Sequence, residues 1–333
     1  MNREAALPGF LAASGFAGAA FDPLPVDCSF RSYTRLHGGP RPALLMNAPP
    51  GLEPLEPFVA IAGHLRRLGL SAPQVIAHDL EHGYALVEDF GDATFTRRLD
   101  AGADARALYE LAIDTLTALQ AQPEAAAITV PAYDLDRLMG EADLFLDWYW
   151  PAIHGTPPAS EARTEYESLL RALLQPIADG PRTLVLRDFH VDNLMTLEGR
   201  TGIAACGLLD FQDAVLGHPA YDLASLLQDA RRDVAPDLAA AMQARYAVAL
   251  PDYADDRAYH VLAAQRHLKV LGIFTRLSRR DGKSHQLHHC PRLWRLIGEC
   301  IAAEPCLQPL GDWLARYWPA KARITPGLPE AAL

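Results

Sequence analysis

The sequence predicts an α+β protein with a strand-rich amino-terminal lobe and a helix-rich carboxy-terminal lobe. Short apolar segments broken by Pro and Gly fill residues 1–92. From about Thr94 onward, long segments carry apolar residues at spacings of three and four, which is typical of amphipathic helices. One strand-like island, residues 183–211, interrupts these helical segments. We therefore expect an amino-terminal lobe over residues 1–92 and a carboxy-terminal lobe over residues 93–333.

The amino-terminal lobe is expected to be a small antiparallel sheet with one inserted helix. A helix is predicted over residues 58–68, because Phe58, Ile61 and Leu65 lie on one helical face. The predicted strands cover residues 31–36, 43–47, 74–77 and 84–87.

The first twenty residues allow two interpretations. Residues 5–20 are small and apolar, and residues 17–20 resemble a signal-peptidase site. However, Glu4 offsets Arg3, and Pro8 and Gly9 break the run. A short packing helix is the favoured interpretation, with a cleaved signal as the alternative.

The carboxy-terminal lobe begins with a strongly periodic segment, residues 105–121, where Leu108, Leu111 and Leu119 follow helical spacing. Residues 138–150 and 161–178 show similar patterns. The remainder, to about Tyr317, is again mostly helical. We find no internal repeat and no long low-complexity linker.

Composition excludes several classes of protein. Half of the 333 residues are apolar and the net charge is −11, so we expect a folded protein that binds neither nucleic acid nor an anionic membrane. No run of 18 apolar residues predicts a membrane span. Five cysteines, an odd and sparse number, favour reduced thiols and a cytoplasmic location over a disulfide framework.

The densest polar signal follows the apolar segment 183–186. There the chain presents Asp188, His190, Asp192 and Asn193 within six residues. Two further apolar segments, 194–197 and 203–209, surround a turn and lead to Asp210. A hairpin is therefore expected to bring Asp188, Asn193 and Asp210 to neighbouring strand ends.

This order of groups is what phosphoryl transfer requires. A carboxylate orients the attacking hydroxyl, and oxygen ligands hold Mg²⁺ on the nucleotide phosphates. Protein kinases use an Asp, an Asn five residues later and a second Asp after a hairpin, and Asp188, Asn193 and Asp210 follow that order. Each residue alone could be an ordinary turn residue. The ordered combination favours a kinase.

The stretch Arg187-Asp188-Phe189-His190-Val191-Asp192-Asn193-Leu194, followed by Gly207-Leu208-Leu209-Asp210-Phe211-Gln212-Asp213, resembles the aminoglycoside phosphotransferase superfamily. Within it, the chain is most similar to bacterial anomeric N-acetylmuramate/N-acetylglucosamine kinases of peptidoglycan recycling. The stretches that carry this closer resemblance are residues 27–35, 46–50, 86–92, 217–233, 271–277 and 280–283.

The resemblance implies a bilobal protein-kinase-like fold that uses ATP and Mg²⁺. Asp188 would be the catalytic carboxylate, and Asn193 and Asp210 would hold the magnesium ion. The main chain from Glu88 to Phe90 would bind the adenine. Asp222 would support the catalytic loop. Because the family's amino-terminal stretch belongs to the folded domain, the resemblance also favours the packing helix.

The chain departs from the superfamily pattern at three places. Leu186-Arg187 stands where His-Gly is common, the strand 44–47 lacks a lysine, and residues 27–35 lack a Gly-rich loop. The phosphates still require positive charge. Arg31 or Arg35, with the backbone near Ser29, is expected to supply it, although each arginine could equally be a surface residue.

The resemblance also implies the substrates, which are ATP and a small sugar phosphorylated at its anomeric hydroxyl. No protein partner is predicted. N-acetylmuramate carries a lactyl carboxylate, so a cation near the pocket would help to bind it. The candidate substrate residues, each of which could be an ordinary surface or packing residue, are His190, Gln212, Asp213, His218, Arg266 and Lys269.

Other functions stay open at this stage. A kinase for an aminoglycoside or another small alcohol would use the same catalytic groups. A weakly catalytic, nucleotide-binding regulatory protein would be consistent with the missing strand lysine. Gly282-Lys283-Ser284 lacks the upstream glycine of a P-loop. His285, His288, His289 and Cys290 match no common zinc spacing.

Overall fold

The computed structural model describes residues 3–25 and 30–327. The chain forms two compact units. The first unit contains residues Met1–Val130 and Val191–Ala214, and the second contains Pro131–His190 and Val215–Leu333. This division follows from how compactly the chain packs, not from the roles of its residues. The functional division at residue 92 therefore stays a prediction.

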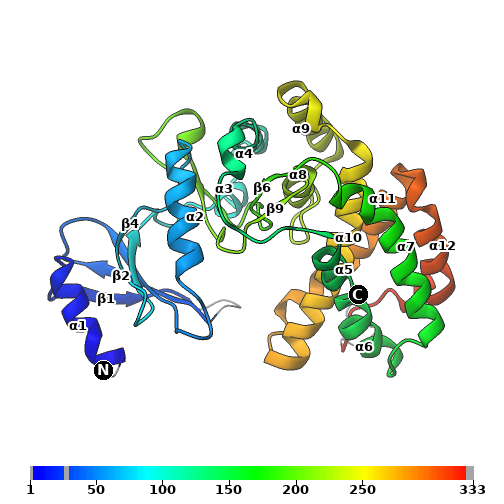
Figure 1. Ribbon diagram of the computed structural model, residues 1–333, viewed down its shortest axis with the longest axis horizontal. Helices are drawn as coiled ribbons and strands as arrows, with labels where there is room; N and C mark the ends of the chain where they lie inside the picture. Colours follow the sequence, from blue (N-terminus) through cyan, green and yellow to red (C-terminus); the bar gives the residue numbers. More distant parts are fainter. Residues whose placement is uncertain (1–2, 26–29, 328–333) are drawn as a thin grey trace. The chain divides into compact units, whose positions relative to one another are not determined.

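The first unit is built on a five-stranded antiparallel sheet with the order β1-β2-β3-β5-β4 (Figure 1). The four strands predicted from the sequence are all present. The additional strand β1 is short and exposed at every position, so it lacks the alternating pattern that marks a half-buried strand. The strands are β1 (Ala20–Pro23), β2 (Ser32–His37), β3 (Ala43–Asn47), β4 (Val75–Asp79) and β5 (Tyr84–Glu88).

Two helices pack with this sheet. The expected amino-terminal packing helix is α1 (Arg3–Ala13), whose Leu11 joins a buried cluster with Leu45 and Leu86 of the sheet. Helix α2 (Glu56–Arg67) contacts β4 and buries the predicted apolar face, including Phe58. The ring of Phe58 also stacks on Phe211 at 5.1 Å.

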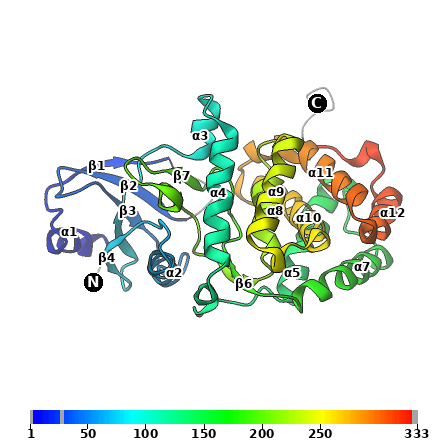
Figure 2. The same cartoon turned by 90° about the horizontal axis from the view of Figure 1, so that it is seen from above.

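The first unit also contains two helices and a two-stranded hairpin. Thr94 and Asp104 cap the helices that follow them, because each side chain accepts a hydrogen bond from a backbone N–H of the first turn. The longer helix runs beside the hairpin and contacts its second strand (Figure 2). These elements are α3 (Phe95–Asp100), α4 (Ala105–Gln120), β7 (Leu194–Thr196) and β8 (Cys206–Leu208).

The second unit is arranged around the long helix α10 (Asp256–Asp281), which contacts α5, α7, α8 and α11. Figure 2 shows α8 and α11 alongside α10. A short antiparallel ladder joins β6 (Thr183–Val185) to β9 (Val215–Gly217). The other helices are α5 (Leu135–Ala142), α6 (Trp150–His154), α7 (Ser160–Ala178), α8 (Ala220–Leu227), α9 (Pro236–Ala249), α11 (Cys290–Ala303) and α12 (Gln308–Tyr317).

Residues 138–150 are largely helical, as their pattern predicts, but they do not form one regular α-helix. Helix α5 ends at Ala142, and a π-helical turn (Phe145–Tyr149) precedes α6. At this point the backbone packs directly on α10, because a Cβ atom added at Gly272 would lie 2.3 Å from the carbonyl oxygen of Leu144. Periodicity alone does not reveal such a contact.

Two further properties concern the part of the chain that the structure describes. None of the helices among them is both long enough and apolar enough to cross a membrane. The four cysteines in this part of the chain, Cys206, Cys290, Cys300 and Cys306, are free thiols. Cys28 lies outside the described residues.

Candidate active site

Asp188 follows the buried strand β6 in the second unit. The backbone before it is unusual, because Arg187 has a φ of 70°, in the left-handed region that favours glycine. The carboxylate of Asp222, on α8, accepts hydrogen bonds from the backbone N–H groups of Leu186 (2.7 Å) and Arg187 (2.8 Å). Asp222 is fully buried, and its two hydrogen bonds hold the backbone of this loop in place.

A buried ion-pair network holds the side chain of Arg187. Its guanidinium pairs with Glu141 of α5 and lies over the ring of Tyr133, 5.7 Å from the centroid. Glu141 also pairs with Lys269 at 2.8 Å. The charge of Lys269, a candidate substrate residue, is therefore balanced by a protein carboxylate.

Positive charge surrounds the carboxylate of Asp188. Arg266 Nη2 lies 3.9 Å from Asp188 Oδ1. Burial alone would raise the pKa of Asp188, but the positive charges of protonated His190, Lys269 and Arg266 outweigh burial and lower it. Burial in turn lowers the pKa of His190. At neutral pH, the cations next to Asp188 are therefore lysine and arginine, and Asp188 is ionised.

Asn193 and Asp210 belong to the first unit, where the β7–β8 hairpin brings them to the same end. Leu194 pairs with Leu208, and Leu209 N–H donates to the carbonyl oxygen of Asn193 at 2.9 Å. Asp210 has a left-handed backbone with a φ of 55°. The expected juxtaposition of these two residues is confirmed, whereas their action together with Asp188 stays a prediction.

The residues next to Asn193 and Asp210 make hydrogen bonds within the hairpin and to α3. Thr96 Oγ1 donates a hydrogen bond to Asp192, which ties the start of the hairpin to α3. Gln212 Nε2 donates to Asp210 Oδ1 at 2.7 Å and makes a longer contact with Asp213 at 3.5 Å. Gln212 and Asp213 therefore lie beside Asp210, as the sequence suggests.

The segment expected to bind adenine is held by charged side chains of the first unit. Glu88 pairs with Arg200, and its backbone N–H donates to Gln74 O at 2.9 Å. The guanidinium of Arg200 also lies over the ring of Phe90, 5.4 Å from the centroid.

The two arginines expected near the phosphates both have carboxylate partners. Arg31 is buried and pairs with Glu53 at 2.8 Å. Arg35 pairs with Asp89 at 2.6 Å and with Asp92 at 3.2 Å. Ser29 lies outside the described residues. Either arginine would have to exchange or share its partner in order to contact a phosphate.

His218 does not lie beside Asp188. The β6–β9 register pairs Thr183 with Gly217 and Val185 with Val215, so His218 follows the end of the ladder opposite to Asp188. It is 7% exposed and lines a small cavity with Tyr133 and Leu262. The antiparallel register thus places His218 and Asp188 after opposite ends of the ladder, and sugar binding by His218 stays a prediction.

Two residues that the sequence did not single out organise these segments. Glu141 supports Arg187 and Lys269, and Arg200 supports Glu88 and Phe90. Neither lies in a motif, and their partners are distant in the sequence. Within the described residues, no group of three or more His, Cys, Asp or Glu side chains could hold a metal ion, so the zinc alternative gains no support.

Comparison with known proteins defines the family. A model of the phosphotransferase enzyme family matches residues 21–259, which include Asp188, Asn193 and Asp210. The chain belongs to this family. Membership makes it a phosphotransferase, which favours a kinase over the alternative of a weakly catalytic regulatory protein.

Similar members of the phosphotransferase family include three named N-acetylmuramate/N-acetylglucosamine kinase. The protein from Caulobacter vibrioides is 38% identical, over 97% of this chain and 98% of its own. The protein from Pseudomonas aeruginosa is 36% identical over 94% of each chain. The protein from Neisseria meningitidis is 32% identical, over 80% of this chain and 81% of its own.

Solved structures of other proteins share the fold of this chain. The GDP complex of aminoglycoside 2'-phosphotransferase-IIIa has a TM-score of 0.62 at 15% identity, over 90% of this chain and 99% of its own. A choline/ethanolamine kinase family protein from Mesorhizobium loti has a TM-score of 0.61 at 15% identity, over 93% of this chain and 99% of its own. The fold is therefore the protein-kinase-like fold that the sequence predicts.

Proposed function

We propose that the chain is an ATP-dependent kinase that transfers a phosphoryl group to the anomeric hydroxyl of N-acetylmuramate and N-acetylglucosamine. The product is the sugar 1-phosphate, and the reaction belongs to peptidoglycan recycling in the cytoplasm. The observation that carries this proposal is the similarity, over 80% or more of the chain, to four curated kinases of that name at 32–38% identity.

The proposed catalytic carboxylate is Asp188. Transfer of a phosphoryl group needs mainly positioning and charge stabilisation, so Asp188 orients the hydroxyl and accepts its proton late in the reaction. A hemiacetal hydroxyl is more acidic than an ordinary alcohol, which lowers the basicity that Asp188 requires. The lowered pKa of Asp188, held down against burial by the surrounding positive charges, keeps it ready to accept a hydrogen bond at neutral pH.

Asn193 and Asp210 are the proposed magnesium ligands. Their side chains offer an amide oxygen and a carboxylate, which are the hard oxygen donors that Mg²⁺ prefers, and the hairpin places both residues at one end. The donor set therefore fits the ion. When bound, Mg²⁺ offsets the negative charge of the nucleotide phosphates.

A turnover assay tests the function. Purified protein is incubated with ATP, Mg²⁺ and one acceptor at a time: each of the two sugars and a cationic aminoglycoside. ADP release is followed, and phosphorus NMR locates the phosphate. We expect both sugars to be phosphorylated on the anomeric oxygen, whereas turnover of the aminoglycoside alone would contradict the proposal.

The variant Asp188→Asn should lower kcat at least about 100-fold, which is the size of effect expected for loss of a general base. The matched control is Asp252→Asn, which changes an exposed carboxylate before α10 and should leave kcat unchanged. A folded Asp188→Asn protein with wild-type kcat would remove Asp188 from the mechanism.

A further inference from the structure

The turn of the β7–β8 hairpin carries Arg200, whose guanidinium contacts three residues outside the hairpin. Its Nη2 pairs with Glu88 Oε1 at 2.5 Å, and its Nη1 donates to Ser71 Oγ at 2.8 Å. The guanidinium carbon also lies over the ring of Phe90, 5.4 Å from the centroid. All four residues belong to the first unit. One side chain of the hairpin thus holds both ends of the segment 88–90, which is expected to bind adenine.

The strands of the hairpin are joined to the same stretch of chain. The backbone N–H of Thr196 donates to Ala93 O at 2.8 Å. Strand β8 approaches Phe90 so closely that a Cβ atom added at Gly207 would lie 2.9 Å from Phe90 Cδ2. These contacts attach the hairpin along its length, and Arg200 completes the attachment at its turn.

The three contacts of Arg200 use different parts of one rigid group. A guanidinium directs separate N–H groups at Glu88 and Ser71, while its flat face lies on the ring of Phe90. Ser71 is itself fixed, because its hydroxyl donates to Ala204 O at 2.7 Å. A lysine would keep the charge but could not make all three contacts at once.

Glu88 has a second cationic partner, which offers a comparison. Arg66 of α2 lies 3.4 Å from Glu88 Oε2 and donates to Ala72 O at 3.0 Å. Arg66 therefore balances the same carboxylate, but neither of these two contacts involves the hairpin. A change at Arg66 alters the surroundings of Glu88 and leaves the hairpin attached, whereas a change at Arg200 also releases the hairpin turn.

The opposite end of the hairpin carries Asn193 and Asp210, the proposed magnesium ligands. A nucleotide that binds through its base to residues 88–90 and through its phosphates to Mg²⁺ must contact both places at once. Binding is tighter when the contacting groups are already held in position, because less ordering is needed. The attachment of the segment 88–90 to the hairpin should therefore set the affinity for the nucleotide.

We propose that Arg200 is a positioning residue for the nucleotide, which fixes the segment 88–90 on the hairpin that carries the magnesium ligands. This inference rests on the proposed function through the use of ATP. Arg200 acts through Glu88 and Phe90, so its loss weakens nucleotide binding more than it slows phosphoryl transfer. The KM for the sugar stays near the wild-type value.

The test measures the Kd for ADP in the presence of Mg²⁺, without sugar, by isothermal titration calorimetry. Loss of a charge-assisted hydrogen bond should weaken ADP binding about 10-fold in Arg200→Gln, and Arg200→Lys should recover part of the loss. Arg66→Gln should bind ADP within about twofold of the wild type, because it breaks only an exposed pair. In the turnover assay, Arg200→Gln should raise KM for ATP and change kcat by less than about twofold.

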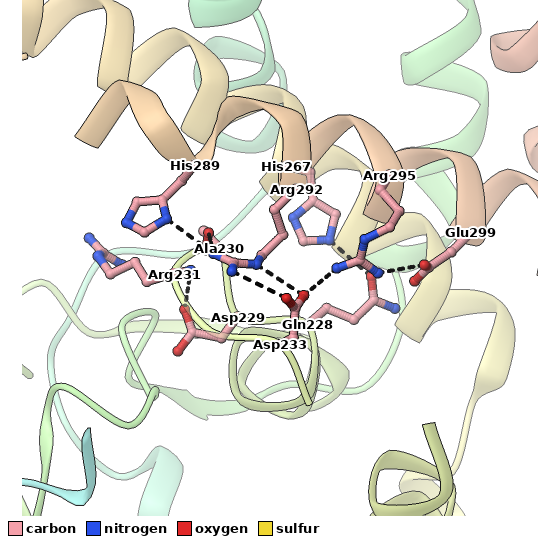
Figure 3. Close-up of polar contacts among 10 residues, drawn as sticks. All are labelled: Gln228, Asp229, Ala230, Arg231, Asp233, His267, His289, Arg292, Arg295 and Glu299. Atoms are coloured by element: carbon pink, nitrogen blue, oxygen red, sulfur yellow. Dashed lines mark hydrogen bonds and ion pairs between the residues drawn. The ribbon is translucent and has the colours of Figure 1, made fainter. Parts of the chain in front are cut away.

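A loss of stability could also weaken binding, so Arg292→Gln serves as a second control. In the second unit, Arg292 of α11 pairs with Asp233 at 3.0 and 3.2 Å, and Arg295 pairs with the same carboxylate (Figure 3). The side chain of Arg292 is 24% exposed, against 31% for Arg200. Arg292→Gln should therefore lower the melting temperature by a similar amount and leave ADP binding unchanged.

Three outcomes would overturn the assignment: ADP binding in Arg200→Gln that matches the wild type, an equal loss in Arg66→Gln, or an equal loss in Arg292→Gln. Because ADP binding is measured without sugar, none of these outcomes depends on the acceptor. A wild-type protein that binds ADP but phosphorylates neither sugar would refute the proposed function alone, and a selective loss in Arg200→Gln would still support the role of Arg200.

Discussion

Arg187 and Asp210 share a left-handed backbone, but the two positions are supported in opposite ways. They are the only non-glycine residues with positive φ in the described part of the chain. Such a conformation costs about 1–2 kcal/mol per residue. Arg187 is held by the buried carboxylate of Asp222 on α8 and the largely buried carboxylate of Glu141 on α5. Asp210, in contrast, is exposed and receives a hydrogen bond from Gln212, two residues away.

The difference suggests that the backbone strain has a different role at each of the two positions. At Arg187, distant buried groups impose the conformation, and the side chain itself becomes part of the packing. At Asp210, the support is local, and the side chain is the proposed metal ligand. Observed strain at such positions is a guide to function. If this comparison holds, substitutions around Arg187 should mainly alter stability, and those at Asp210 mainly activity.

The largest effect is expected for Glu141→Gln. This change leaves Arg187 and Lys269 as buried cations without their carboxylate, which should lower the free energy of unfolding by about 3–5 kcal/mol. Burial opposes ionisation of Glu141, but Lys269 and Arg187 outweigh burial and lower its pKa. Its stabilisation is therefore present above about pH 4.5 and is lost as the pH falls. Urea denaturation at pH 7 and pH 4 measures both effects.

The control for this prediction is Glu110→Gln on α4. Glu110 forms an exposed pair with Arg106, four residues earlier on the same helix. Such surface pairs contribute well under about 1 kcal/mol. Equal losses in the two variants would mean that the Arg187 network is no more than a surface feature.

The next effect is expected at Asp222. Replacement by Ala leaves two buried backbone N–H groups without an acceptor, which should lower the free energy of unfolding by about 2–4 kcal/mol. Asp222→Asn retains an acceptor and should lose less. Denaturant titration of both variants and the wild type gives the comparison.

Asp222 also predicts a dependence on pH. Burial raises its pKa to about 7, although the two backbone hydrogen bonds act in the other direction. The folded state therefore holds a proton that the unfolded state has already released, so this stabilisation is complete below about pH 4 and is lost as the pH rises through 7. The wild type should lose stability relative to Asp222→Asn between pH 5 and pH 8. A constant difference would contradict the raised pKa.

The smallest change in stability is expected for Asp210→Gly. Glycine adopts positive φ without a steric cost, so the free energy of unfolding should rise by up to about 1 kcal/mol. Sugar phosphorylation should nevertheless fall at least about 100-fold, because the proposed metal ligand is lost. Thermal melting and the ADP assay measure the two effects. Arg187→Gly is the paired variant: it relieves the same strain but breaks the ion pair with Glu141, so it should lose stability.

The sequence predicted what depends on local patterns. Strand β3 and the apolar face of α2 follow from their own residues. The spacing of Asp188 and Asn193 is likewise a local signal. In contrast, Glu141 contacts Arg187 across 46 residues, and the turn after α5 depends on the close approach of Gly272. Such features arise from the packed structure, and no window of residues records them.

The geometry at Arg187 bears on how relatives of this protein are found. The superfamily pattern commonly has glycine immediately before the catalytic aspartate, and here an arginine adopts the backbone angle that glycine would provide. A motif search that insists on glycine would discard this chain, although Arg187 adopts a backbone angle that glycine favours. A search pattern could instead require a positive φ at this position. It would then accept any residue whose backbone is held by a buried carboxylate, as Arg187 is by Asp222, and would recover such divergent members.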